Sequence, residues 1–390
     1  MDPDYKVKQE YWHVDTSKYL YIAAQSCYDT VIQNEVLFFL CVLYKASFPL
    51  KGDLIMQQSL ELFLLAAEEL NFSKAAKRAF VTQQCLSDHI KRLEQSYGTP
   101  LFYRKPTISL TPYGLALQAA VQNMKLIETN LTNEFRAISN DERGEFNFGI
   151  NATRARTLFP KIYPPFYERY PQIRLNVRIN ETRSMESLLL NGNLDMCLGI
   201  DSIVHPRLAS KKIALNPLYC VMSTGTFATA AETPHLILKE EIKKGIDLSH
   251  FQEIPFLLCL PESTTRNMIE TSLSQQNIFL KNTLSISDYE THFDLCAQNC
   301  MATICPSAAL ESVIRLNRIL PPKNQLLVFP VRDLVNTLNI YLIYQKDLRF
   351  TGYMNYFVAL LIDEILKQEQ AANNYVNMQA NLTDDNTTDQ

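Results

Sequence analysis

The chain has 390 residues, of which 47% are hydrophobic and 20% charged, with ten glycines and a formal net charge of −4 at pH 7. This length predicts two or three domains, and the composition is that of a globular protein, which excludes a disordered or collagen-like chain. The sequence has no glycine-rich phosphate loop and no overall basic charge. A nucleotide-dependent enzyme is therefore not expected, and any nucleic-acid site has to be a local patch.

Cysteine usage and hydropathy indicate the compartment. Nine cysteines occur without a C-x-x-C pair, which indicates buried free thiols in a reducing compartment. As an alternative, Cys296, Cys300 and Cys305 could bind a metal or respond to oxidants, although His292 is the one histidine near them. The longest apolar run, 36–44, is too short to cross a membrane, and no secretory signal precedes it. We expect a cytoplasmic protein without metal, cofactor or membrane association.

Residues 1–55 differ from the rest of the chain because they show no regular pattern, whereas Met56 opens a strongly periodic segment. The dipeptide Lys51-Gly52 is what a purine-rich ribosome-binding site would encode in frame. We expect Met56 to be the native start and residues 1–55 to be an extension of the gene model. The alternative is a short helical appendage over 29–45.

Three short helices are predicted next. Apolar residues at helical spacing predict a first helix from residue 60. Ser73 is expected to cap a second helix over 74–80, and Thr82 a third over 83–97. Two helices joined by a tight turn, the second beginning with amides, are typical of a DNA-binding helix-turn-helix.

A wing and a long helix are predicted after Gly98, which ends the third helix. Two short β-like runs around Pro106 predict the wing. Thr111 is expected to cap a helix over 112–137, whose apolar stripe would form a coiled-coil seam with a second copy. Within 57–111 basic residues outnumber acidic ones by two. Such a cluster would neutralise DNA phosphates, although an ordinary solvated surface explains the charge equally well.

The stretch 63–114 also carries an ordered set of framework residues. They are Phe63, Ala66-Ala67-Glu68, Phe72-Ser73, Ala75-Ala76, Val81-Thr82-Gln83, Leu86-Ser87, Ile90, Leu93-Glu94, Gly98, Leu101-Phe102, Arg104 and Leu110-Thr111. In order and spacing this set resembles the N-terminal domain of LysR-type transcriptional regulators. Two positions depart from the family pattern: Gln84 stands where proline is common, and Asp88 where a basic or neutral polar residue is common.

The resemblance implies that the third helix enters the major groove of double-stranded DNA and that the wing contacts the backbone. The residues expected at this interface are Ser73, Lys77, Thr82, Gln83, Gln84, Ser87, Asp88, His89, Lys91, Arg92 and Arg104. The amides suit adenine, and the basic side chains suit phosphates. Two copies joined through their linker helices imply an interrupted inverted repeat as the operator. The resemblance also implies a homodimer or homotetramer, and RNA polymerase as a partner.

Beyond residue 144 the pattern alternates between strands and helices, and its βαβαβ start predicts a mainly parallel sheet. Strands are expected at 146–150, 173–179, 194–200, 212–223, 255–260, 283–287, 301–305, 326–331 and 338–344, and helices at 157–170, 185–190, 264–275, 289–299 and 352–368. This part resembles the LysR effector domain, which is similar to a periplasmic binding protein with two α/β lobes and a cleft between them.

A small-molecule effector is expected beyond the carboxyl ends of the strands, near helix N-termini that favour anions. The expected contacts are Asn151, Thr153, Arg154, Asp201, Ser263, Thr264 and Arg266. One of Arg154, Arg156 and Arg266 would pair with a carboxylate of the effector, which makes the effector an anion. The alternative for each of these residues is an ordinary helix cap or surface base.

These observations predict a mixed fold. Its parts are a winged helix-turn-helix at 56–111, a linker or dimerisation helix within 112–143, a two-lobed α/β effector domain at 144–368 and a disordered tail at 369–390. Lobe I would take 144–219 and 326–368, and lobe II 220–325. We expect a sequence-specific DNA-binding transcriptional regulator controlled by a small molecule, and not an enzyme. The alternative is a solute-binding protein or enzyme on the same two-lobed fold.

Overall fold

The computed structural model describes residues 51–138, 143–230, 244–332, 334 and 338–385. Most of the predicted extension over 1–55 lies outside the described residues, and the first described helix begins at Lys51. The chain divides into two compact units, Met1–Thr111 and Pro112–Gln390.

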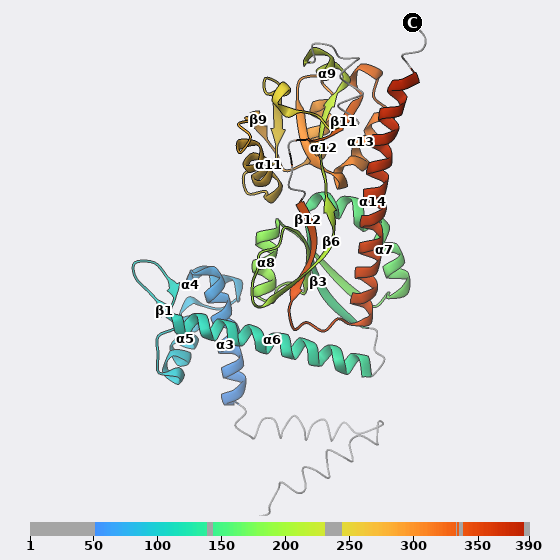
Figure 1. The fold of residues 1–390 in the computed structure, drawn as a ribbon. Coiled ribbons are helices and arrows are strands. Elements are labelled where there is room, and N and C mark those ends of the chain that lie inside the picture. Colours follow the sequence, from blue (N-terminus) through green and yellow to red (C-terminus); the bar gives the residue numbers. More distant parts are fainter. Residues whose placement is uncertain (1–50, 139–142, 231–243, 333, 335–337, 386–390) are drawn as a thin grey trace, which may run out of the picture. The chain divides into compact units, whose positions relative to one another are not determined.

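The first unit holds three helices and a two-stranded wing (Figure 1). Its elements are α3 (Lys51–Glu69), α4 (Phe72–Arg78), α5 (Gln83–Tyr97), β1 (Phe102–Tyr103) and β2 (Ser109–Leu110). Phe63 and Leu86 are fully buried between the helices. The Phe102 ring lies edge-on to Phe63 and Phe72, with centroids 5.6 and 5.2 Å apart. The wing is therefore anchored in the same apolar core as the helices.

Helix caps explain where these elements begin and end. Thr82 accepts a hydrogen bond from the Cys85 amide at 3.1 Å, and Gly98 adopts φ 67°, so both predicted ends of α5 are confirmed. The prediction for α4 is wrong by two residues. Asn71, not Ser73, caps this helix by accepting from the Lys74 amide at 3.0 Å. Ser73 lies inside the first turn, where its hydroxyl is available to another partner.

Lobe I of the second unit is a five-stranded sheet with the order β4-β3-β5-β12-β6. Its elements are β3 (Gly144–Ile150), α7 (Ala152–Arg169), β4 (Ile173–Ile179), α8 (Thr182–Leu190), β5 (Met196–Ile200), β6 (Leu208–Asn216) and β12 (Leu338–Gln345). The β3, β4 and β5 strands run parallel, but β12 is antiparallel to both β5 and β6. Because β6 is antiparallel to β12, it runs in the same direction as β5. The prediction of a mainly parallel sheet is thus confirmed for lobe I, in which β12 is the antiparallel strand.

Lobe II is a second five-stranded sheet with the order β11-β7-β10-β8-β9. Its elements are β7 (Leu218–Ser223), α9 (Thr224–Ala230), η1 (Leu248–Phe251), β8 (Pro255–Leu258), α11 (Thr264–Ser274), β9 (Lys281–Ser285), α12 (Tyr289–Cys296), β10 (Ala302–Pro306), η2 (Ser307–Ala309), α13 (Leu310–Asn317), η3 (Pro322–Asn324) and β11 (Leu326–Pro330). Because β11 pairs with β7 along its whole length, it belongs to lobe II, and not to lobe I as expected.

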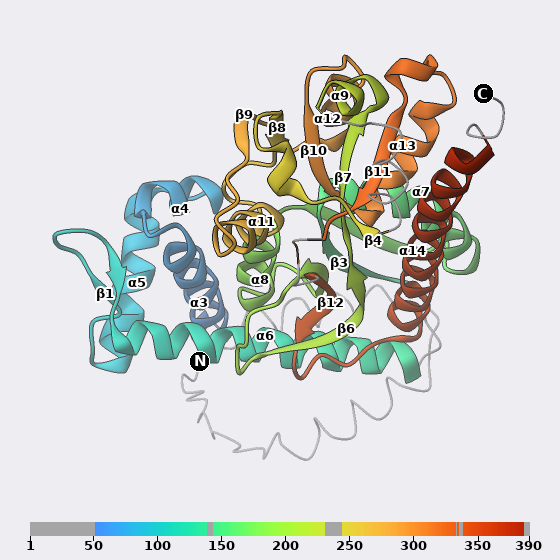
Figure 2. The ribbon, with the colours of Figure 1, turned by 45° about the horizontal axis from the view of Figure 1, so that its top comes forward.

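The C-terminal helix α14 (Gly352–Asp385) contradicts the prediction of a disordered tail at 369–390. Ala372 and Val376, four residues apart on one helix face, are buried. Tyr219 donates to Asn373 at 3.2 Å, and the Val328 amide donates to Gln379 at 3.1 Å. Figures 1 and 2 show α14 running alongside both lobes. Its second half is therefore a folded part of lobe II.

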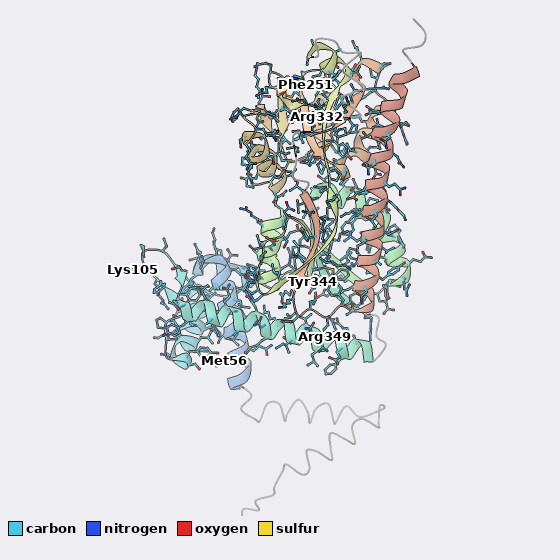
Figure 3. All side chains as sticks on the ribbon, in the orientation of Figure 1. Met56, Lys105, Phe251, Arg332, Tyr344 and Arg349 are labelled. Atoms are coloured by element: carbon cyan, nitrogen blue, oxygen red, sulfur yellow. The ribbon has the colours of Figure 1, made fainter. Side chains whose placement is uncertain are left out.

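The linker helix α6 (Pro112–Ile138) packs on lobe I through polar contacts. Asn130 donates to the Asp347 carbonyl at 2.8 Å and accepts from the Arg349 amide at 3.0 Å. Arg349, labelled in Figure 3, also pairs with Glu134 at 3.0 Å. An apolar stripe at helical spacing stays exposed on α6, formed by Met124, Ile127, Leu131 and Phe135.

All seven cysteines within the described part of the chain are free thiols. Cys296 and Cys305 are buried, and Cys300 is exposed. Across the described residues no group of three or more His, Cys, Asp or Glu side chains is placed to hold a metal ion. None of the helices in that part of the chain combines the length and apolar character needed to cross a membrane.

Candidate nucleic-acid interface and ligand cleft

The N-terminal part of α5 presents polar side chains to solvent. Thr82, Gln83, Gln84 and Asp88 are exposed there, with Ser87 half-buried between them. Ser73 of α4 donates a hydrogen bond to Oε1 of Gln83 at 2.7 Å. This contact joins the starts of α4 and α5 on one exposed face and restrains the Gln83 amide. A restrained amide at the start of a helix is suited to reading base edges.

Basic residues of the predicted interface are exposed on the same unit. Lys77, Lys91 and Arg92 are exposed. Arg78 differs from them because it lies 2.7 Å from Glu68 and 3.0 Å from Glu69, so its charge is already paired. The exposure of Lys77, Lys91 and Arg92 fits their assignment to phosphates, whereas Arg78 holds α4 against α3.

Arg104 stands at the base of the wing with its side chain 54% exposed. It pairs with Glu94 of α5 at 3.2 Å and lies 5.9 Å from the Phe72 ring centroid. Glu94 also accepts from the Leu101 amide at 2.9 Å. These contacts fix Arg104 relative to α5, while Lys105 extends the wing loop beyond it (Figure 3).

His89 does not belong to this face, and its assignment to the interface is wrong. The residue is only 7% exposed, and its Nδ1 lies 2.7 Å from the Ser59 hydroxyl of α3. Burial lowers the pKa of His89, Arg92 lowers it further, and Asp88 acts in the opposite direction. His89 is a polar core residue between α3 and α5.

The lowered pKa of His89 predicts an acid-sensitive first unit. As pH falls below the ordinary value of 6.5, His89 takes up a proton in the unfolded chain before it does so in the folded one. The free energy of unfolding that neutral His89 supports is therefore fully present above that pH and is lost as pH falls towards the folded pKa. We expect the unfolding temperature to fall less between about pH 7.5 and about pH 5.5 in His89→Gln than in the native chain. His250→Gln, in the other unit, is the matched control. An unaltered pH slope in His89→Gln would contradict the assignment.

A cavity of about 300 Å³ lies between the two lobes. Residues of both lobes line it: Asn151, Ala152, Thr153, Arg154, Ile179, Asn180, Glu181, Thr182, Ile200, Asn216, Cys259, Ser263, Thr264, Thr265, Ser287, Tyr289 and Pro306. Asn151 caps α7 by accepting from the Arg154 amide at 2.9 Å, and Ser263 caps α11 by accepting from the Arg266 amide at 3.5 Å. The structure thus brings together five predicted contacts, Asn151, Thr153, Arg154, Ser263 and Thr264.

Arg154 lies at the floor of this cavity and is 3% exposed. Its Nη2 donates to Oδ1 of Asn216 at 2.6 Å. Burial lowers the pKa of Arg154 to about 10, and the negative charge of Glu369 opposes this shift. The guanidinium therefore stays protonated at neutral pH, as a buried cation that faces the cleft.

Two of the predicted contacts lie elsewhere. Asp201 accepts from the Asn339 amide at 2.9 Å and joins β5 to β12 outside the cavity lining. Arg266 pairs with Glu270 at 2.8 Å and donates to the Cys259 carbonyl at 2.8 Å. Arg156, the third arginine considered for a carboxylate, lies 3.3 Å from both Asp288 and Glu290. Arg154 is therefore the arginine that the cleft contains.

Sequence reasoning missed several lining residues, among them Glu181, Cys259, Ser287 and Tyr289. Each follows the carboxyl end of a strand, β4, β8 or β9. The rule that ligand contacts follow the carboxyl ends of strands, used for β3 and β5, would have found these residues if it had also been applied to β4, β8 and β9. Burial raises the pKa of the Cys259 thiol and of the Tyr289 hydroxyl, so both stay protonated at neutral pH.

Comparison with protein-family models gives two matches. The model described as "Bacterial regulatory helix-turn-helix protein, lysR family" matches residues 57–115. The model described as "LysR substrate binding domain" matches residues 139–365, which is more than half of the chain. The chain belongs to the LysR family. It is a DNA-binding transcriptional regulator with an effector-binding domain, as predicted.

Individual LysR-family relatives agree with this assignment. A "Probable RuBisCO transcriptional regulator" of Phaeodactylum tricornutum is 28% identical over 267 residues, covering 67% of this chain and 84% of the relative. The HTH-type regulator YybE of Bacillus subtilis is 34% identical over 142 residues, covering 36% of this chain and 49% of the relative. A full-length OxyR variant of Pseudomonas aeruginosa has the same fold, with a TM-score of 0.55 and 22% identity over 79% of this chain and 94% of that one. The matched effector-domain range ends at residue 365, so the lobe II part of α14 lies beyond it.

Proposed function

We propose that this LysR-family regulator reads an interrupted inverted repeat through α5 and is controlled by a small effector that places a carboxylate near Arg154. The observation that carries the proposal is the exposed polar start of α5, where Ser73 holds Gln83 in place at 2.7 Å. The proposed setting is the cytoplasm, because the protein needs access to both its operator and RNA polymerase.

In this proposal, Gln83, Gln84, Ser87 and Asp88 face base edges, while Ser73 and Thr82 support them. Lys77, Lys91, Arg92 and Arg104 contact phosphates. Their exposure on the unit that carries α5 supports this division of roles. His89 is excluded because it is buried against α3.

The proposed oligomer is a homodimer or a pair of dimers joined through α6. Support comes from the exposed stripe of Met124, Ile127, Leu131 and Phe135, whose spacing of three and four residues fits a helix–helix seam. Pairing two copies would double the DNA contacts. A twofold axis between them requires two half-sites in opposite orientation.

The proposed effector site is the cleft between the lobes. Two caps, Asn151 and Ser263, start α7 and α11 at the cavity. Exposed backbone N–H groups at helix N-termini favour negative charge. These N–H groups and the buried Arg154 would bind the carboxylate of the effector. Thr153 and Thr264 would supply further hydrogen bonds to it.

A footprint of the full chain on the DNA upstream of its own gene, at two salt concentrations, tests the operator. We expect a protected inverted repeat that persists at the higher salt. Arg104→Ala should weaken binding on all sequences and lower the slope of log K against log salt by about 1. Arg78→Ala is the matched control, because two carboxylates, Glu68 and Glu69, hold Arg78, whereas Arg104 has only Glu94 and is more exposed. If Arg104→Ala left both the affinity and the salt slope unaltered, the wing assignment would be contradicted.

A further inference from the structure

The cleft contains charges of both signs. Among the described residues that line it, Arg154 is the one cation and Glu181 the one carboxylate. An effector that is simply an anion would meet the attraction of the first and the repulsion of the second. The chemistry of the ligand therefore depends on how each charge is already compensated by the protein.

Arg154 retains hydrogen-bonding capacity. A guanidinium has five N–H donors, and within the described part of the chain its side chain has a single hydrogen-bond acceptor, Asn216. The cation shares the cavity with the N-termini of α7 and α11, helices of 18 and 11 residues. Donors and positive potential are thus concentrated at one end of the cavity, which fits an acid group.

Glu369 limits how much negative charge this end can take. Gln368 donates to the Thr157 carbonyl at 3.2 Å, which places this turn of α14 against the start of α7. The neighbouring Glu369 has a buried Oε1 to which no described residue donates a hydrogen bond, and its charge acts on Arg154. Because Glu369 already offsets part of the Arg154 charge, a single carboxylate suits the site better than a phosphate or a dicarboxylate.

The carboxylate of Glu181 favours a positive charge on the ligand. Glu181 stands at the N-cap of α8, but its side chain makes no capping hydrogen bond and is exposed to the cleft. No described residue donates a hydrogen bond to its carboxylate. The surrounding protein raises the pKa of Glu181 by burial, since part of its hydration is lost. A bound ammonium group would replace that hydration and compensate the charge.

We propose that the cleft binds a small zwitterion, an amino acid or a close relative, with its carboxylate at Arg154 and its protonated amine at Glu181. This inference rests on the proposed effector site and narrows the ligand from an anion to a molecule of no net charge. It also gives the two lobes separate tasks. Lobe I supplies both charges, and lobe II supplies the neutral donors and acceptors Ser263, Thr264 and Tyr289.

Thermal shift and calorimetry on the full chain test the proposal. The probes are the proteinogenic L-amino acids and ω-amino acids of the same range of chain lengths. Each is paired with its 2-oxo or des-amino analogue, which keeps the carboxylate and lacks the amine. We expect at least one amino acid to bind and its des-amino counterpart to bind about tenfold more weakly or not at all. Glu181→Gln should remove this preference, so that both members of the pair bind the variant with similar affinity.

Glu262→Gln is the matched control, since Glu262 is exposed next to Ser263 and lies outside the cavity lining. The Glu262→Gln variant should still bind the amino acid more tightly than its des-amino counterpart. Carboxylates that bind equally well with and without an amine would overturn the zwitterion while leaving the anionic effector site intact. Failure of all the amino acids to bind would also overturn it. The footprint on DNA does not depend on either result, so failure of the DNA-reading proposal is seen separately.

Discussion

Ending the chain after Gln368 should destabilise the second unit by about 4 kcal/mol, which corresponds to a loss on the order of 10 °C in unfolding temperature. The truncation removes the buried Ala372 and Val376 from the surface of lobe II. It also removes Tyr375, whose hydroxyl accepts from Asn317 at 2.7 Å, and Gln379, which is bonded to the backbone of Leu326 and Val328. Differential scanning calorimetry of the two chains measures the effect.

Removing only residues 386–390 is the control, and it should leave the transition unaltered. The two truncations differ by the part of α14 that packs on lobe II. If the shorter chain unfolded at the native temperature, the buried contacts of Ala372 and Val376 would have no energetic weight. The polar composition of 369–390 would then have predicted the behaviour of the tail correctly.

Gln83→Ala should weaken binding to the operator by about 1–3 kcal/mol, roughly fivefold to 150-fold, while binding to unrelated duplexes changes little. The proposed role of the Gln83 amide, which Ser73 restrains, is to read a base edge, and the amide carries no charge that a phosphate could use. Ser73→Ala should act in the same direction with a smaller effect, because it frees the amide without removing it. Fluorescence anisotropy on specific and scrambled duplexes measures both.

Gln95→Ala is the matched control for Gln83. Gln95 is exposed near the C-terminal end of the same helix, away from the polar face at its start. The Gln95→Ala variant should bind the operator with the affinity of the native chain. Equal losses on specific and scrambled duplexes in Gln83→Ala would show that this side chain contributes to general affinity, and α5 would then have to read the operator through Gln84, Ser87 or Asp88.

Local signals in the sequence were enough to predict several elements. The bounds of α5 and β4 agree with the prediction. The Thr82 hydroxyl accepts a hydrogen bond at the start of α5, and Gly98 adopts the left-handed conformation at its end. Neither of these local contacts depends on distant parts of the chain. By contrast, α7 begins at Ala152, five residues before its predicted start. Its capping residue, Asn151, also lines the cleft, so the ligand contact and the helix cap predicted as alternatives for it are both present.

Features that depend on distant contacts could not be predicted in the same way. The second half of α14 is polar and rich in asparagine, and it folds because lobe II covers Ala372 and Val376. The β12 strand is antiparallel because it re-enters lobe I between β5 and β6, a placement that the local pattern does not encode. Likewise, β11 belongs to lobe II through its pairing with β7.

The same distinction holds for the candidate sites. Asn151, Thr153 and Ser263 reach the cleft because the carboxyl ends of strands and the starts of helices meet there. His89 and Asp201 have suitable chemistry in suitable segments, but Ser59 and Asn339 already engage them. His89 lies three residues after Leu86 and four before Leu93, so helical spacing places it on the buried face of α5, and its polar chemistry alone suggested the interface.

The continuity of α14 across both lobes limits how this gene can change in length. Residues of α14 contact lobe I through Gln368 and lobe II through Tyr375 and Gln379. Each residue inserted between these points would rotate the second set of contacts by about 100° and shift it by about 1.5 Å. A single-codon insertion or deletion there would therefore turn Val376 and Gln379 away from lobe II. Changes of about seven residues would keep the contacting face but displace it by two turns, so we expect this segment to tolerate substitutions far better than changes in length.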